Sequence, residues 1–258
     1  MKQPTIAAIV ALLACSTTAH SEVLKAANVS SDYQLFVSVW EGSIEIRPNS
    51  DSVVSVDYRC EGNTENEAVD VESGLRVVSR ESSLPELRRS EDKITFKAQE
   101  EAGRCLVAVS APPSLGARIR INDTGEIIVR DWLGSMTAWS AGGDVTLVAQ
   151  QGAFSVTAMN GDASVDFVSN TLGADSAITA ANGLVALSFQ SEPAVTLRAQ
   201  ARWGAVLTDL DVSFAREADE QSTWSVAQIG GGGPIVTLRN LNSDIRITRA
   251  ASVDQADR

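Results

Sequence analysis

The chain has 258 residues, of which 44% are hydrophobic and only 5% aromatic, and its formal net charge is −12 at pH 7. This length suits one large all-β domain or two small ones, with a core of small and β-branched side chains. The acidic charge repels phosphate backbones and argues against nucleic acid as a partner.

The first 21 residues, MKQPTIAAIVALLACSTTAHS, are typical of an export signal. One lysine precedes an apolar run that ends at Cys15, and small polar residues follow up to Ser21, after which we predict cleavage. A second interpretation stays open, because the residues before Cys15 approximate a lipoprotein box in which Cys15 would carry a lipid. No later stretch approaches the roughly twenty apolar residues of a membrane-spanning helix. We therefore expect an exported protein, periplasmic or at the cell envelope, with a linker over residues 22–34.

Two cysteines, Cys60 and Cys105, remain once the signal is removed. In an oxidising compartment such a pair predicts a disulfide, and two buried free thiols are the alternative. The single histidine, His20, lies in the signal, so the mature chain lacks the histidine of a Ser-His-Asp or Cys-His site and of a metal site. We predict no catalytic residues, no metal and no cofactor.

Short strands are predicted along the first half of the mature chain. Residues 35–40 and 43–46 alternate in hydrophobicity on either side of Gly42, which predicts two strands joined by a glycine turn. Further short strands are predicted at residues 53–58, 75–78, 94–97 and 106–109. Helical periodicity is weak, and residues 83–91 are the one stretch that suits a short helical turn.

Turns recur at nearly even intervals between residues 117 and 249. Their central residues are Gly125, Gly143, Gly161, Gly183, Gly204 and Ser243, which gives intervals of 18, 18, 22, 21 and 39 residues. Apolar residues hold a fixed phase to these turns, as at Val145 and Leu147, two and four positions after Gly143. Units of about twenty residues, each with two half-buried strands, predict coils that cover one another in a stack. We predict one all-β domain over residues 35–249, a β-solenoid or parallel β-helix-like stack, followed by a polar tail over residues 250–258.

Four consecutive glycines, Gly230 to Gly233, raise the question of a phosphate-binding loop. Such a loop places its glycines before a Lys-Ser/Thr pair and a helix. Here Pro234 and a strand at residues 235–238 follow instead. The run therefore predicts a re-entry of the backbone into the last coil.

Four segments, taken in order, carry a resemblance to a known family. They are VWEGSIEIRP, CLVAVSAPPSLGARIRINDTGEIIV, AGGDVTLVAQQGAFSVTAMNGDASVDF and IGGGGPIVTLRNLNSDIRI. Together they resemble a bacterial family known as putative adhesins, exported domains of unknown function related in style to the adhesin heads of auto-transporters. The resemblance covers residues 35–248 and implies a β-solenoid-like exported protein with a binding or structural role. It implies no site residues, because the family has no agreed activity.

Two sets of residues are candidates for contact with a ligand. Trp132 lies in a second turn of its coil, where an exposed ring could stack on a sugar, although a ring that caps the core is the alternative. Glu126, Asp144 and Asp162 each follow a turn centre, so stacking would align them about 4.8 Å apart as a ladder for a divalent cation. The alternative is ordinary turn chemistry, in which Asp side chains bond to nearby backbone.

The sequence predicts a non-enzymatic, adhesin-like binding or structural protein of the bacterial cell envelope, whose partner is an envelope glycan or protein. Two alternatives remain open at this point. One is a polysaccharide lyase or hydrolase that depends on carboxylates, and the other is a periplasmic protein that acts in envelope stress or binds a partner protein.

Overall fold

The computed structural model describes residues 20–61, 85–216 and 223–250, and these residues form strands joined mostly by tight turns. A short 3-10 turn, η1 (Glu100–Ala102), precedes one of the strands. The prediction of an all-β chain is confirmed. Residues 1–19 of the predicted signal at 1–21, including Cys15, lie outside the described residues. The predicted strand at 75–78 and the predicted tail from residue 251 onward lie outside them too.

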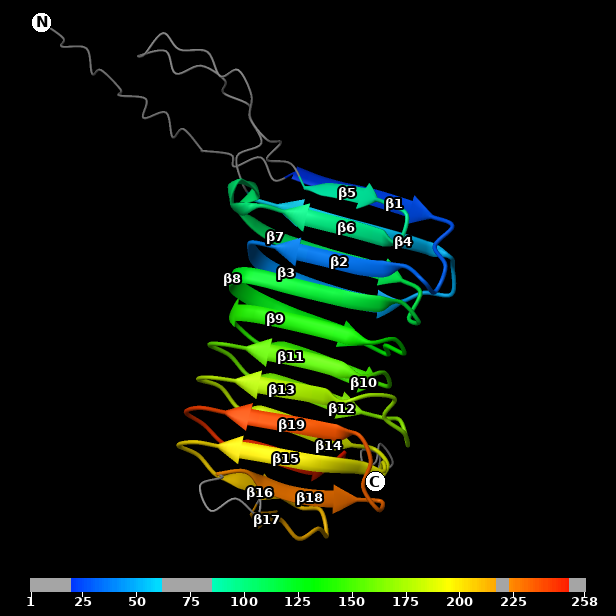
Figure 1. Ribbon diagram of the computed structural model, residues 1–258. Helices are drawn as coiled ribbons and strands as arrows, with labels where there is room; N and C mark the ends of the chain where they lie inside the picture. The colour runs from blue at the N-terminus through cyan, green and yellow to red at the C-terminus, as the bar shows by residue number, and fades with distance from the viewer. Residues whose placement is uncertain (1–19, 62–84, 217–222, 251–258) are drawn as a thin grey trace, which may run out of the picture.

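The strands form two series that face each other (Figure 1). The front series runs in the order β5 (Glu86–Arg89), β6 (Lys93–Ala98), β2 (Gln34–Val39), the first half of β8 (Gly116–Arg130), β9 (Met136–Gly142), β11 (Phe154–Ala158), β13 (Ser176–Ala180), β19 (Ile235–Asn240), β15 (Val195–Ala201), β18 (Ser225–Ile229) and β17 (Ala215–Arg216). The back series runs in the order β1 (His20–Ala27), β4 (Val53–Cys60), β7 (Arg104–Ala111), β3 (Glu41–Pro48), the second half of β8, β10 (Val145–Gln150), β12 (Ala163–Phe167), β14 (Val185–Phe189), β20 (Ile245–Arg249) and β16 (Val206–Thr208).

Strands in the middle of both series pair in parallel, and each front strand continues through a turn into a back strand. We call one such pair of strands a rung. Antiparallel strands cover one end of the stack, where β4 and β1 follow β7 and β5 follows β6. At the other end β18 and β17 cover the front series. Covered or short edges protect a sheet from pairing with other chains.

The order of the rungs in space differs from their order in the sequence. The rung β2–β3 lies between β6–β7 and β8, and the rung β19–β20 lies between β13–β14 and β15–β16 (Figure 1). The glycine run before β19 therefore returns the chain to a position inside the stack, rather than adding a last rung at its end. Gly230, Gly231 and Gly232 have φ values of 57°, 86° and 84°, which favour glycine.

Continuous rows of buried side chains run between the two series. In the back series Val145 lies in register with Ile127 on one side and with Ala163 on the other. Val185 in turn lies in register with Ala163 and with Ile245. All of these side chains are fully buried. The register confirms that the apolar residues keep the same phase to each turn.

The turns between front and back strands stack closely enough to require glycine. A Cβ atom on Gly143 would lie 2.0 Å from the carbonyl oxygen of Gly125, and a Cβ on Gly125 would lie 1.7 Å from that of Gly42. The φ angle of Gly143 is 128°, a value that side chains disfavour. The recurring turn glycines therefore permit the close spacing of successive rungs at this corner.

Two local predictions were wrong. Residues 22–34, predicted as a linker, contain most of β1, which pairs antiparallel with β4. Residues 83–91, predicted as a helical turn, contain β5, which pairs antiparallel with β6. Neither segment has a strong alternation of hydrophobic and polar residues. Each is extended because a neighbouring strand supplies its backbone hydrogen bonds.

The predicted disulfide between Cys60 and Cys105 is confirmed, and it joins β4 to β7 across a Cα–Cα distance of 4.1 Å. Its cysteines are 45 residues apart. A cross-link over such a loop stabilises mainly by restricting the unfolded chain.

Removal of this disulfide should destabilise the fold clearly. We expect the double variant Cys60→Ser/Cys105→Ser to lose about 3 kcal/mol of unfolding free energy, measured by denaturant titration without reductant. Reduced wild-type protein is the matched control and should unfold at nearly the same midpoint as the variant. An oxidised wild type that unfolds together with the variant would contradict the prediction.

Candidate binding surface

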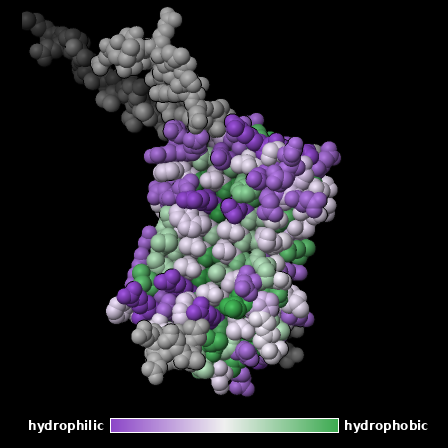
Figure 2. Space-filling model, viewed as in Figure 1, coloured by the Kyte–Doolittle hydropathy of each residue, from purple (hydrophilic) through white to green (hydrophobic). Residues whose placement is uncertain are grey.

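Four cationic side chains gather on the front face. Lys93 and Lys97 point outward from β6, and Arg118 and Arg120 point outward from β8, because alternate residues of a strand face the same side. Strand β2 lies between these two strands and pairs with both. We call these four residues the cationic patch. Figure 2 shows hydrophilic residues gathered on the corresponding upper part of this face.

Aromatic rings contact the charged groups of the patch. The Phe36 ring on β2 has the Lys93 Nζ atom 5.8 Å and the Arg118 Cζ atom 5.5 Å from its centroid. The Arg120 Cζ atom lies 4.2 Å from the centroid of the Trp139 ring. Such cation–π contacts attract a cation without neutralising it. The rings therefore hold three of the charged groups in place and leave their charge available.

Carboxylates of the described residues do not pair with the patch. Among the residues that the structure describes, no Asp or Glu oxygen lies within ion-pair distance of any of its four cations. The Arg120 Nε atom donates a hydrogen bond to the neutral Asn122 Oδ1 atom at 2.6 Å. An unpaired cationic cluster is unusual on a chain whose net charge is −12.

The back face offers a direct contrast. There the Arg47 and Arg130 side chains both contact the Glu45 carboxylate, at 2.8 and 3.3 Å. The hydrogen bond from Arg47 is the main cause that lowers the pKa of the Glu45 carboxyl, and the bond from Arg130 adds to it. Arg47 and Arg130 are therefore paired within the protein, whereas Arg118 and Arg120 form no ion pair with any carboxylate of the described residues.

The patch surrounds a shallow hollow of about 280 Å³. Hydroxyl, aromatic and cationic groups share its lining, which contains no carboxylate. The lining residues are Phe36, Val37, Ser38, Lys93, Thr95, Lys97, Arg118 and Arg120. A neighbouring hollow nearer the turn contains Glu100 and Glu101, which mark an acidic boundary on that side.

Hydroxyl side chains continue the patch along the front face. Thr137 on β9 is in register with Arg118, and Ser155 on β11 is in register with Thr137. In the adjacent row Trp139 follows Arg120, and Thr157 follows Trp139. The middle of this face is correspondingly pale in Figure 2, between the hydrophilic and hydrophobic extremes. Straight rows of outward groups thus run from the patch across several rungs.

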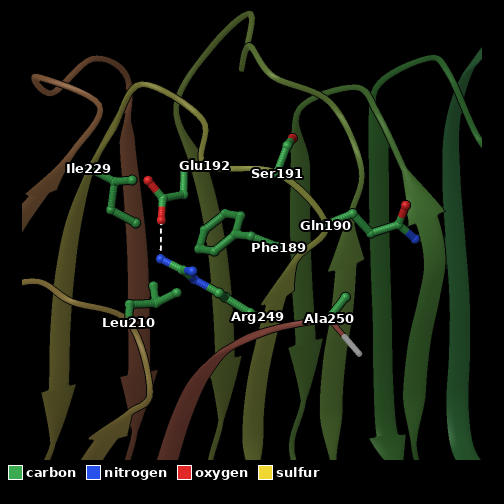
Figure 3. A pocket seen from close by; sticks show the side chains of 8 residues that line it. All are labelled: Phe189, Gln190, Ser191, Glu192, Leu210, Ile229, Arg249 and Ala250. Atoms are coloured by element: carbon green, nitrogen blue, oxygen red, sulfur yellow. Dashed lines mark hydrogen bonds and ion pairs between the residues drawn. The ribbon is translucent and has the colours of Figure 1, made fainter. Parts of the chain in front are cut away.

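A second hollow, of about 320 Å³, lies towards the other end of the stack (Figure 3). Its one lining carboxylate, Glu192, forms an ion pair with Arg249 beside the Phe189 ring. Glycoside hydrolysis of the usual kind uses two carboxyl groups. This hollow therefore does not present the pair of carboxyl groups that a glycoside hydrolase of the usual kind uses.

The prediction that Trp132 contacts a ligand was wrong. The Trp132 side chain is 0% exposed, and its Nε1–H donates a hydrogen bond to the Leu115 carbonyl oxygen at 3.0 Å. Asp131 before it has a positive φ of 52°, and the turn leaves the next residue, Leu133, 46% exposed. Trp132 therefore covers the core, as the alternative interpretation stated.

Glu126, Asp144 and Asp162 do lie at the same turn of successive rungs. The Asp144 Oδ1 atom accepts a hydrogen bond from the backbone N–H of Asp162 at 2.8 Å, and the Asp162 Oδ1 atom accepts one from Leu184 at 2.8 Å. No group of three or more His, Cys, Asp or Glu residues in the described part of the chain could hold a metal ion. These contacts favour the turn interpretation over a cation ladder.

The cationic patch was missed in the sequence, although part of its signal was present. Period-two spacing alone places Lys93 and Lys97 on one face of a strand, and Arg118 and Arg120 on one face of another. The sequence does not show that β2, from much earlier in the chain, separates these strands and contributes Phe36.

Comparison with known proteins finds neighbours among solved structures alone. No known family model and no curated protein matches this chain. A putative cell adhesion protein from Clostridium sporogenes is 11% identical, with 90% of this chain and 100% of that chain covered and a TM-score of 0.47. Putative adhesins from Bacteroides fragilis and Parabacteroides distasonis are 9% and 10% identical, cover 91% of this chain and 98% of their own, and have TM-scores of 0.36 and 0.28. Two of the three are thus named adhesins, as the sequence resemblance suggested, and the third is named a cell adhesion protein.

Proposed function

We propose that this is an exported, non-enzymatic, adhesin-like protein of the bacterial cell envelope, which binds an envelope component through its front face. The cationic patch, which forms no ion pair with a carboxylate of the described residues, carries this proposal. A cluster of fixed cations beside rings and hydroxyl groups suits the recognition of an anionic partner. The mature sequence after Ser21 has no histidine, which favours binding over the histidine-dependent kinds of catalysis.

Two observations support a place outside the cytoplasm. The disulfide between Cys60 and Cys105 suits an oxidising compartment. The first 21 residues suit an export signal, and cleavage after Ser21 would leave residues 22–27 of β1 in the mature chain. The described residues include no helix that is long and apolar enough to cross a bilayer.

The architecture that we propose for this role is a β-solenoid-like stack with inserted rungs. The parallel register of β9, β11 and β13 in front, and of β10, β12 and β14 behind, supports it. In such a stack each rung completes the core of its neighbour, so side chains on the outer faces are not needed for packing. Outer positions can then serve a partner.

The proposal is tested by cosedimentation of the mature protein with envelope fragments from the source bacterium. We expect Arg118→Gln/Arg120→Gln to bind roughly 30-fold more weakly than the wild type, because two charge-assisted contacts are lost, each worth about 1 kcal/mol. The matched control is Arg47→Gln/Arg130→Gln, which removes the same charge from the paired cluster on the back face. Equal binding by the two double variants would overturn the assignment of the front face.

A further inference from the structure

We infer that the cationic patch binds a linear polysaccharide whose sugars carry carboxylates, such as a uronate polymer. This inference rests on the proposed function, since it concerns the same face and names the chemistry of its ligand. Three features of the surface lead to it: cations that no carboxylate of the described residues pairs with, aligned hydroxyl groups, and strands whose backbones are paired on both sides.

The charges of the patch require an anion as the partner. Arg118 and Arg120 are two positions apart on β8, and Lys93 and Lys97 lie across β2 from them. Strands are about 4.8 Å apart, so the backbones of β6 and β8 are about 10 Å apart. An anion over the Phe36 ring would lie beside Lys93 and Arg118, whereas Arg120 lies against the Trp139 ring. A chain that repeats its negative charge along its length can contact all of these cations.

The rows beyond the patch favour a ligand that is rich in hydroxyl groups. Thr137, Ser155 and Thr157 present their side chains outward, in straight rows that begin at Arg118 and Arg120. Hydroxyl side chains both donate and accept hydrogen bonds, as sugar hydroxyls do. The Phe36 ring adds an apolar surface between the cations. An acidic sugar chain that lies along the stack satisfies each of these groups, whereas a purely ionic polymer would use only the cations.

Other anionic partners fit the surface less well. An acidic peptide that added a strand would pair with a terminal strand of the sheet, whereas β6, β2 and β8 each pair with a strand on both sides. The front face offers side chains rather than backbone, which suits a ligand recognised by its charge and hydroxyl groups.

Isothermal titration of the folded mature protein with a defined oligogalacturonate tests the inference. We expect binding that weakens as ionic strength rises, because exposed charges are screened by salt. The same oligomer with its carboxylates reduced to alcohols should bind at least about tenfold more weakly, a loss of about 1.4 kcal/mol. Arg118→Gln/Arg120→Gln should show a similar loss for the oligogalacturonate, and Arg47→Gln/Arg130→Gln should bind it as the wild type does.

Several results would overturn the inference. One is equal affinity for the reduced oligomer, which would leave the carboxylates without a role. Another is equal or tighter binding of polyglutamate, which would indicate an acidic protein as the partner. A third is absence of binding to the oligogalacturonate while Arg118→Gln/Arg120→Gln still loses envelope binding, in which case the proposed function stands and the ligand class is wrong. Thermal unfolding of each variant establishes that it is folded before its binding is compared.

Discussion

Replacement of Gly143 by alanine is expected to lower the free energy of unfolding by about 4 kcal/mol, as the sum of backbone strain and overpacking. The φ angle of 128° is disfavoured for alanine, and its Cβ would lie 2.0 Å from the Gly125 carbonyl oxygen. That oxygen belongs to the backbone of the preceding rung, so the clash with the alanine Cβ could be relieved only if the two rungs moved apart. Denaturant titration of the purified variant measures the effect.

Gly173→Ala is the matched control for this experiment. A Cβ on Gly173 would meet no atom within 4 Å, and the residue is exposed. We expect its unfolding free energy to stay within about 0.5 kcal/mol of the wild type. If both alanine variants unfolded at the same denaturant concentration, close stacking of the turns could not be the reason for the recurring glycines.

Truncation of Trp132 to alanine is the second change with a large expected effect, about 4 kcal/mol of unfolding free energy. Trp132 is fully buried and is the largest such side chain, and its indole N–H satisfies the Leu115 carbonyl oxygen. The variant would leave both a cavity and an unpaired carbonyl group. Where it remains folded, its affinity for envelope fragments should equal that of the wild type.

Trp203→Ala provides the comparison, because the Trp203 side chain is 73% exposed. The free energy of unfolding of the Trp203→Ala variant should differ from that of the wild type by no more than about 0.5 kcal/mol. Thermal unfolding followed by circular dichroism distinguishes the two tryptophans. A Trp132→Ala protein that kept its stability but lost binding would restore the ligand-contact role that the buried position argues against.

The regular spacing of apolar residues in the sequence correctly predicted which side chains lie inside the stack. Val145 and Leu147 have the same phase to their turn as Val185 and Leu187 have to theirs, and the structure places all four in the core. This was predictable because a strand alternates its faces with a period of two, so local order alone decides which side chains point inward. The disulfide was predictable for a different reason, since Cys60 and Cys105 are the only cysteines outside the predicted export signal.

Elements with weak patterns were not predictable in the same way. β1 and β5 are extended because β4 and β6 offer them backbone partners, and neither segment contains a strong signal of its own. Trp132 shows the same limit for a single side chain. Its local sequence suits an exposed turn, and only the surrounding backbone directs the ring into the core.

The sequence by itself therefore determined the class of fold, the alternation of buried and exposed residues, the turn glycines and the cysteine pair. The tertiary structure alone decided the order of the rungs, with β2–β3 and β19–β20 inserted between strands distant in sequence. Parallel rungs of similar length and phase can pair in many orders, so local residue patterns do not select one. That order brings Phe36 between Lys93 and Arg118, and so it creates the candidate binding surface.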